Sequence, residues 1–329
     1  MLKPLTIIVL SLFVTKFLRT RPSGPNTILL SQLHSHFPSA QKCDKNIILG
    51  WNTCIDLLVN ASTVSNDLNL TPTSTNAVDH ENIPHLVALQ ESLSFWFSKG
   101  GAAERLMSNA QAEEIFGKVV AAANNDPKAR LRVGGNAALM ATSLAKFGCN
   151  VHLGGPIGST LAKRLETGIQ FTSTNVTKDM KDVIDPIHLI LEYQKGQRLG
   201  DMVAPRANRY ILVHDPLNAR LAGLEPLRDY LRLHTNVQQY DVFVASGLNQ
   251  LEALATPELR SERLRAVRSA IQELPMTLPV HLELASMTDT TFLQSMASTM
   301  FPVANSFGLN EEEVSNSSEE SEHRVMEAL

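Results

Sequence analysis

The chain has 329 residues, of which 43% are hydrophobic and 5% aromatic, and its formal net charge is -4. A chain of this length can bury one large core, or one core with a small appended domain. The negative charge and the few aromatic rings exclude an extended nucleic-acid surface, which needs clustered basic and stacking side chains.

The N-terminal segment contains an apolar run at residues 5–14 that follows Lys3. The run is too short to cross a bilayer comfortably and is typical of a signal-peptide core or a weak membrane anchor, so we assign residues 1–21 to such a segment. Residues 22–45 contain turn-forming proline, glycine and serine and predict a linker. Any membrane tether is therefore expected at residues 5–14.

The cysteines are Cys43, Cys54 and Cys149. Their odd number and unpaired spacing indicate neither a disulfide framework nor a zinc site. Cys54 falls in the first strand region, where packing is the expected role of a cysteine.

Residues 47–51 form a short apolar run that predicts a first buried strand, and the segment Asn52-Thr-Cys-Ile-Asp56 follows it. Polar groups at the C-terminal end of a first parallel strand lie where open α/β sheets bind ligands. Asn52 and Asp56 are therefore candidate ligand-binding residues. The alternative is a pair of turn-capping side chains.

Residues 60–84 are rich in serine, threonine and asparagine and predict a surface loop. Residues 85–99 have an apolar stripe at helical spacing that ends at a Gly-Gly pair. Glu104 follows small residues that let a ligand approach the backbone, and its carboxylate can accept hydrogen bonds from hydroxyl groups. The alternative is a glutamate favoured at a helix N-terminus by the helix dipole.

The segment Gly134-Gly135-Asn136 separates a strand-like run at 129–133 from a helical run at 137–147. Such a turn exposes backbone N–H groups to a ligand oxygen. No Gly-Lys-Ser/Thr follows, so the turn is not a Walker loop. Gly135 and Asn136 are candidates for contacts with a ligand.

Residues 187–193 and 210–213 are rich in β-branched and aliphatic residues and predict two further strands. His188 lies in the first strand, where a core histidine is the alternative to a ligand contact. Arg209 precedes the second strand, and its guanidinium suits a transferring phosphoryl group because it presents paired donors to phosphate oxygens. The alternative for Arg209 is a surface salt bridge.

Strand-like runs at 241–245 and 279–285 flank a helical run at 257–273, and this alternation predicts a parallel α/β sheet. The second run contains His281 and Glu283, and a further strand-like run leads to Asn310 and Glu313. Carboxylates from two strand ends predict a Mg²⁺ site, because Mg²⁺ takes few carboxylates and keeps water or phosphate oxygens as its other ligands. The alternatives are a satisfied core pair and a solvated acidic helix start.

These motifs carry a resemblance to a known family. The segments PVHLELASMT and SFGLNEEE, together with GGAAERL, VGGNAAL, HLILEY, ANRYILVHD and ASGL in the same relative order, resemble the ADP-dependent sugar kinases of the ribokinase-like superfamily. The resemblance implies a ribokinase-like α/β fold, with a mainly parallel sheet flanked by helices and a small lid domain. It also implies a monomer in the endoplasmic reticulum or secretory pathway. The implied large domain covers residues 46–59, 108–186 and 214–314, and the lid covers 60–107 and 187–213.

The resemblance implies Mg²⁺-dependent transfer of the β-phosphoryl group of ADP to the 6-hydroxyl of glucose. The resemblance implies that Arg209 stabilises the transferring phosphoryl group and that Glu283 and Glu313 organise Mg²⁺ directly or through water, supported by His281 and Asn310. It assigns the sugar to Asn52, Asp56, Glu104, Gly135, Asn136 and His188.

The family's Gly-x-Gly-Asp motif, whose aspartate is the base for the sugar hydroxyl, has no match here. Gly200-Asp201 lacks the first glycine and lies in the expected lid region. Residues 315–329 are polar and acidic and predict a disordered tail. We therefore expect a C-terminally truncated form. The alternatives to an active kinase are a form that binds glucose or partners without turnover, and an unstable fragment.

Overall fold

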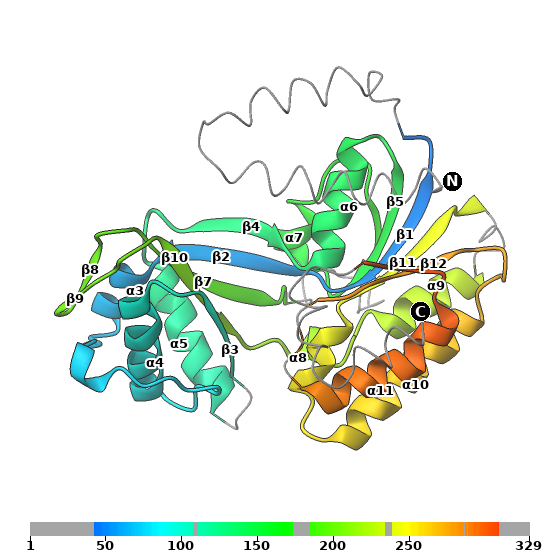
Figure 1. The fold of residues 1–329 in the computed structure, drawn as a ribbon. Coiled ribbons are helices and arrows are strands. Elements are labelled where there is room, and N and C mark those ends of the chain that lie inside the picture. The colour runs from blue at the N-terminus through cyan, green and yellow to red at the C-terminus, as the bar shows by residue number, and fades with distance from the viewer. Residues whose placement is uncertain are drawn as a thin grey trace, which may run out of the picture.

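The computed structural model describes residues 43–107, 111–173, 184–233, 239–285, 287 and 289–308 of the chain. Two main sheets organise these residues (Figure 1). The larger sheet has six strands, all parallel, in the order β13-β12-β11-β1-β5-β6. Its strands are β1 (Asn46–Trp51), β5 (Asn150–Gly155), β6 (Gln170–Ser173), β11 (Val242–Ser246), β12 (Val280–Glu283) and β13 (Ser306–Gly308).

Helices cover both faces of this sheet because its strands are apolar on both sides. In β1, Ile48 packs into one core cluster while Ile47 and Leu49 pack into the other. Parallel strands buried on both faces read as continuous apolar runs, as β1 and β11 do here. The first cluster contains residues of α9 (Leu224–Leu233), α10 (Pro257–Gln272) and α11 (Thr290–Met300), and the second contains residues of α6 (Asn136–Lys146).

The second sheet has five strands in the order β3-β10-β7-β2-β4 and is mixed. The pairs β3/β10 and β2/β7 are parallel, and the pairs β7/β10 and β2/β4 are antiparallel. One face of this sheet packs on three helices, which lie together on one side of it in Figure 1. The elements are β2 (Cys54–Asn60), β3 (Ala103–Leu106), β4 (Arg130–Gly134), β7 (Ile187–Tyr193), β10 (Asn208–Val213), α3 (Ala61–Asp67), α4 (Leu86–Lys99) and α5 (Ala112–Asn124).

The capping of α4 matches the sequence prediction of a helix over residues 85–99. The His85 ring accepts a hydrogen bond from the Ala88 backbone N–H at 3.0 Å, which satisfies a donor at the helix start. Gly100 ends the helix with φ +61°, a conformation that glycine adopts without strain. The helix therefore begins and ends where its local sequence directs.

The second sheet extends beyond the ranges that the sequence assigned to the lid. Strand β4 and helix α5 lie with this sheet and its core, although residues 60–107 and 187–213 exclude them. Strand β2 also pairs with β4 and β7, so the chain leaves the larger sheet directly after β1. The division of the chain into domains stays a prediction.

The remaining elements that the structure describes are short. They are the paired strands β8 (Arg198–Leu199) and β9 (Met202–Val203), the 3₁₀ helices η1 (Ser74–Asn76), η4 (Leu248–Ala253) and η5 (Phe301–Val303), and the α-helices α7 (Ser159–Ala162) and α8 (Pro216–Ala219).

Among the residues that the structure describes, no helix is long and apolar enough to cross a bilayer. The expected signal or anchor segment at residues 1–21 and the expected tail at 315–329 lie outside the described residues.

The prediction that the cysteines form no disulfide is wrong. Cys43 and Cys149 are disulfide-bonded, with their Cα atoms 4.7 Å apart and a separation of 106 residues in sequence. Parallel pairing of β1 with β5 places the two cysteines side by side, because both precede their strands and Asn46 pairs with Asn150. The pairing arises from the sheet, so sequence spacing carries no sign of it. Cys54 is the free cysteine among the described residues, and it is buried.

Loss of this disulfide is expected to lower the free energy of unfolding by about 2–5 kcal/mol, because the bond closes a long loop in the unfolded chain. Urea unfolding of the Cys43→Ser/Cys149→Ser double variant beside the wild type measures the effect. A thiol reductant should shift the wild-type midpoint and leave that of the double variant unchanged. Identical wild-type midpoints with and without reductant would contradict the assignment.

Candidate active site

One face of the five-stranded sheet carries Asp56, Glu104, His188 and Arg209 among apolar neighbours, and we call it the polar face. Side chains alternate between the two faces of a strand, and the face opposite the helices carries the even-numbered positions of β2. In the parallel pairing of β2 with β7, Asp56 lies beside His188. Along the same face, Leu58, Ile190, Ile211 and Glu104 occupy one row across four strands.

Arg209 lies on this same face, two residues before Ile211 in β10. Arg209 and Glu104 are both exposed, and both act electrostatically on Asp56. Four residues that the sequence nominated separately, Asp56, Glu104, His188 and Arg209, therefore share one face of one sheet.

His188 is held by a buried carboxylate. Its Nε2 donates a hydrogen bond to Asp215 Oδ2 at 3.1 Å, and the Asp215 side chain is 1% exposed. Burial disfavours the charged imidazole, but the buried Asp215 carboxylate, which accepts its hydrogen bond, outweighs that effect and raises the pKa of His188 well above its usual value. Asp215 is fixed in turn by Asn218, whose backbone N–H donates to Oδ1 at 2.9 Å and whose side-chain amide donates to Oδ2 at 2.5 Å.

Asp56 lies between a buried thiol and the polar face. Cys54 Sγ is 3.6 Å from Asp56 Oδ1, and burial raises the pKa of the Cys54 thiol to about 11, so the thiol is protonated at neutral pH. Burial also raises the pKa of Asp56, while His188 and Arg209 act in the opposite direction. Asp56 is thus a partly desolvated carboxyl group, well placed to accept hydrogen bonds from hydroxyl groups.

The Gly134-Gly135 turn fits against these side chains. A Cβ at Gly134 would lie 2.1 Å from Asp56 Oδ1 and 2.7 Å from Cys54 Sγ, so this position has no room for a side chain. A Cβ at Gly135 would lie 2.5 Å from the Asn52 carbonyl oxygen, and Gly135 has φ +80°. The Asn52 carbonyl accepts the Ala137 backbone N–H at 3.1 Å, which ties the start of α6 to the end of β1.

A second group of polar residues ends neighbouring strands of the parallel sheet. Asn52 follows β1, Ser246 ends β11 and Glu283 ends β12, and these three strands are adjacent. Strand order reverses between β1 and β11, which is the position where open α/β sheets bind ligands. Asn52 Oδ1 and Ser246 Oγ are buried and have no hydrogen-bond partner among the described residues.

Glu283 is buried at 8% exposure, and its Oε2 accepts a hydrogen bond from His281 Nε2 at 3.2 Å. His281 Nδ1 lies 2.9 Å from Ser306 Oγ on β13. A Cβ at Gly308 would lie 2.0 Å from Glu283 Oε2, so β13 approaches the carboxylate closely. Asn310 and Glu313 lie outside the described residues.

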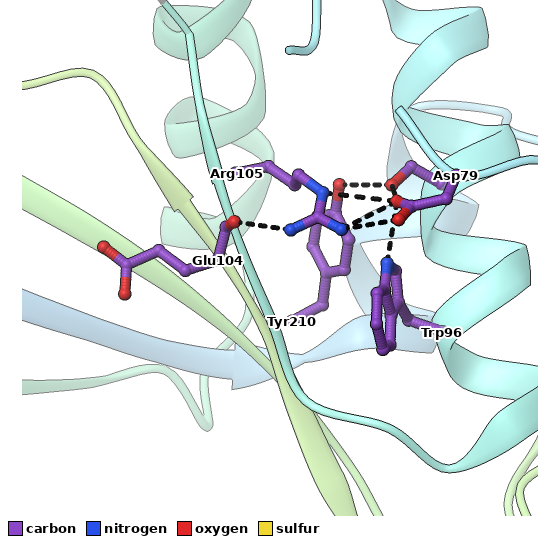
Figure 2. A network of polar contacts seen from close by, with 6 residues as sticks. Asp79, Trp96, Glu104, Arg105 and Tyr210 are labelled. Carbon is purple, nitrogen blue, oxygen red and sulfur yellow. Dashed lines mark hydrogen bonds and ion pairs between the residues drawn. The ribbon is translucent and has the colours of Figure 1, made fainter. Parts of the chain in front are cut away.

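Glu104 lies on β3, and a network of hydrogen bonds among Asp79, Trp96 and Arg105 holds the backbone of this strand. Figure 2 shows Glu104 projecting from β3 away from this network. Arg105 donates to both Asp79 carboxylate oxygens at 2.7 and 2.8 Å, and it donates to the Glu104 carbonyl oxygen at 2.8 Å. Trp96 Nε1 also donates to Asp79, at 2.8 Å. The network therefore fixes the backbone from which Glu104 extends.

The pKa of Asp79 lies below its ordinary value. Partial burial disfavours its charge, but hydrogen bonds from Arg105 and Trp96 outweigh that effect. A lowered folded-state pKa stabilises the fold above the unfolded-state pKa of about 4 and loses that effect as the pH falls. Asp79→Asn is therefore expected to cost about 1–2 kcal/mol at pH 7 and less at pH 3, which is below the unfolded-state pKa. Urea unfolding at both pH values tests this, and an equal difference at the two pH values would contradict the ionic origin.

Sequence reasoning missed three parts of this site. Asp215 was the last residue of a quoted motif, but its contact with His188 depends on tertiary structure. Gly134 was the unassigned member of the Gly-Gly pair. Gly247 follows β11, and a Cβ there would lie 2.4 Å from Asn52 Cβ. A glycine within two residues of the end of a predicted strand is the available signal for both glycines.

A parallel sheet with polar residues at the C-terminal ends of its strands, next to a smaller sheet with a polar face, defines an α/β protein with a candidate site for a small polar ligand. A family model, the ADP-specific Phosphofructokinase/Glucokinase conserved region, matches residues 45–328. The chain belongs to this family.

Two curated relatives support the family. The chain is 32% identical over 274 residues to a probable ADP-dependent glucokinase of Caenorhabditis elegans, which covers 82% of this chain and 51% of that protein. It is 34% identical over 275 residues to the ADP-dependent glucokinase of Bos taurus, covering 82% of this chain and 52% of that protein. The chain thus spans about half the length of the curated relatives it matches.

Solved structures share the fold. A hypothetical ADP-dependent phosphofructokinase from Pyrococcus horikoshii OT3 superposes with a TM-score of 0.67 at 20% identity, over 86% of this chain and 67% of that one. An ADP-dependent kinase complex with fructose-6-phosphate and ADPβS superposes with a TM-score of 0.57 at 18% identity, over 82% and 57% of the two chains. The predicted α/β fold, with a mainly parallel sheet flanked by helices, is confirmed.

Proposed function

We propose that this chain is an ADP-dependent glucokinase that transfers the β-phosphoryl group of ADP to the 6-hydroxyl of glucose and releases AMP and glucose 6-phosphate. The observation that carries the proposal is the shared polar face on which Asp56, Glu104, His188 and Arg209 gather. The relatives named ADP-dependent glucokinase support glucose as the acceptor and ADP as the donor.

The sugar is assigned to acceptors and donors around the Gly134-Gly135 turn. Asp56 and Glu104 would accept hydrogen bonds from sugar hydroxyl groups, and His188, held by Asp215, would donate one. Asn52, Gly135 and Asn136 complete the proposed sugar site. The unpartnered Asn52 Oδ1 supports this role, because a buried amide oxygen without a partner is costly unless a ligand satisfies it.

Arg209 is assigned to the transferring phosphoryl group. Its side chain is exposed on the polar face and forms no ion pair with the residues that the structure describes, so the surface salt bridge that the sequence left open is not formed there. A guanidinium in this position can offer two donors to phosphate oxygens as negative charge develops. The general base for the sugar hydroxyl is not assigned.

Mg²⁺ is proposed as the cofactor, held by Glu283 and Glu313 directly or through water. Glu283 fits, because its buried carboxylate ends β12 beside β11, and the neighbouring Ser246 Oγ has no partner within the described part of the chain. Mg²⁺ commonly takes one or two protein carboxylates together with substrate phosphates. When bound, the ion would neutralise charge on the ADP phosphates.

Glu283→Gln is expected to raise the Mg²⁺ concentration needed for half-maximal turnover by about tenfold while sparing glucose affinity, because the amide removes a metal-binding charge and Glu283 is hydrogen-bonded to His281 rather than to a residue assigned to the sugar. Turnover against Mg²⁺ concentration, with glucose affinity by calorimetry, measures both. Glu258→Gln, at an exposed position of α10, is the matched control. Equal losses of metal response and glucose affinity would refute the metal assignment.

The function is tested by incubating the folded chain with glucose, Mg²⁺ and either ADP or ATP, and by quantifying glucose 6-phosphate and AMP. The proposal predicts equal amounts of both products from ADP and much slower turnover with ATP. Glucose binding without turnover would favour the non-catalytic sugar-binding form instead.

We also propose a secretory-pathway location for the chain. The Cys43–Cys149 disulfide supports it, because structural disulfides persist in oxidising compartments and are rare in the reducing cytosol. Localisation of a tagged chain by fractionation tests this proposal.

A further inference from the structure

Three metal-binding side chains of different chemistry meet at the base of the polar face. One ligand atom each from Cys54, Asp56 and His188 lies within 4.8 Å of the other two. Cys54 and Asp56 come from β2 and His188 from the neighbouring β7, so the sheet sets their spacing. No pattern of spacing in the sequence could indicate this group.

The donor set fits one class of ion. A thiolate, an imidazole and a carboxylate are the ligands that Zn²⁺ takes in proteins, whereas Mg²⁺ prefers oxygen donors alone. Tetrahedral Zn²⁺ with usual Zn–S and Zn–O distances separates sulfur from oxygen by about 3.5 Å. The Cys54 Sγ to Asp56 Oδ1 distance is 3.6 Å. These two donors therefore already stand at the spacing that the ion requires.

Neighbouring residues hold the proposed metal ligands in place and leave one side of the site open to an entering ion. Asp215 anchors the His188 ring through Nε2, and Asn218 anchors Asp215, so the imidazole is held in place. Carboxylates that orient a histidine in this way are common around zinc sites. Cys54 is fully buried, while Asp56 and His188 are only partly buried, so an ion would enter from the side of the polar face.

We propose that Cys54, Asp56 and His188 form a Zn²⁺ site with an open fourth position, and that zinc and glucose exclude one another there. Zinc binding would release the Cys54 thiol proton and the Nδ1 proton of the charged His188 ring to solvent, and the ion would occupy the carboxylate and imidazole assigned to the sugar. The exclusion rests on the function proposed above, whereas metal binding does not depend on it. Zinc would thus act as an inhibitor that glucose displaces.

Cobalt(II) is the probe, because it occupies zinc sites and its bond to a thiolate produces a near-ultraviolet charge-transfer absorption. The wild-type chain, with its disulfide intact and no reductant present, is titrated with Co²⁺ and then with Zn²⁺. We expect the absorption to appear with one equivalent of Co²⁺ and to disappear as Zn²⁺ displaces it. Cys54→Ser should abolish it, and His188→Gln should weaken Co²⁺ binding more than tenfold.

His80→Gln is the matched control, because His80 pairs with Glu91 away from this group and should leave the cobalt spectrum unchanged. Should Cys54→Ser not fold, the wild-type spectrum alone decides the metal site, since Cys54 is the free cysteine of the described chain. No thiolate absorption in the folded wild type, or an unchanged spectrum in Cys54→Ser, would overturn the proposal.

Titrations with glucose distinguish the proposed metal site from the proposed exclusion of glucose by zinc. Saturating glucose is expected to weaken Co²⁺ binding, and calorimetry in metal-free buffer reports whether glucose binds at all. A cobalt site that ignores bound glucose would overturn the exclusion. A cobalt site in a chain that does not bind glucose would support the metal site and contradict the proposed kinase function.

Discussion

Replacing Arg209 with alanine is expected to lower kcat for ADP-dependent phosphorylation of glucose by a factor of about 10³ and to leave glucose affinity nearly unchanged. The guanidinium is assigned to charge that develops on the transferring phosphoryl group, so its removal should act on the transition state rather than on the bound sugar. Initial rates at saturating ADP give kcat, and calorimetry gives the glucose affinity.

Two further variants sharpen this result. Arg209→Lys keeps the positive charge but loses the paired donors, so an intermediate kcat is expected. Arg198→Ala removes an exposed arginine from β8, and it should leave kcat unchanged. A kcat of Arg209→Ala within a few-fold of wild type would remove Arg209 from the mechanism.

Asp56→Asn is expected to weaken glucose binding by about 10- to 100-fold, since a hydrogen bond to an ionised group contributes about 1.5–3 kcal/mol. Because burial raises the pKa of Asp56 above its ordinary value, wild-type affinity should fall as the pH is lowered through that raised pKa. The variant should show no such dependence from this group. Calorimetric titration with glucose from pH 8 down to about pH 4, the ordinary pKa of an aspartate, measures both effects.

The stability of the same variant provides an internal check. A carboxyl group whose pKa is raised in the folded state destabilises the fold at higher pH, so Asp56→Asn should unfold at an equal or higher urea concentration at pH 7. Lost glucose affinity can then not be ascribed to unfolding. Asp44→Asn, at an exposed position, is the control for both measurements. A variant that binds glucose as well as wild type would exclude Asp56 from the site.

The larger sheet could be predicted because its strands are continuous apolar runs that alternate with helices. Such runs record burial on both faces, and β1 and β11 each follow this pattern. The strand order of the second sheet could not be predicted from local sequence patterns. Strand β2 pairs with β4 and β7, whose residues lie more than 70 positions away along the chain, and no local pattern records a pairing of that kind.

The site residues that the sequence predicts differ from those it misses in the same way: the first depend on local sequence, and the second on contacts between distant segments. Asp56, Glu104, His188 and Arg209 were nominated by residue type and by resemblance, and alternation along their strands explains why they share a face. Asp215 and the partnership of Cys43 with Cys149 depend on contacts between distant segments. The chemical role of a side chain can be predicted from its residue type. The distant residue that holds it in place, such as Asp215 for His188, cannot.

A crystal structure of the chain with glucose shows whether the sugar binds to the polar face of the five-stranded sheet. We expect glucose hydroxyl groups within hydrogen-bond distance of Asp56, Glu104 and His188, with the sugar next to the Gly134-Gly135 turn. Glucose bound elsewhere, with these side chains unchanged, would contradict this expectation.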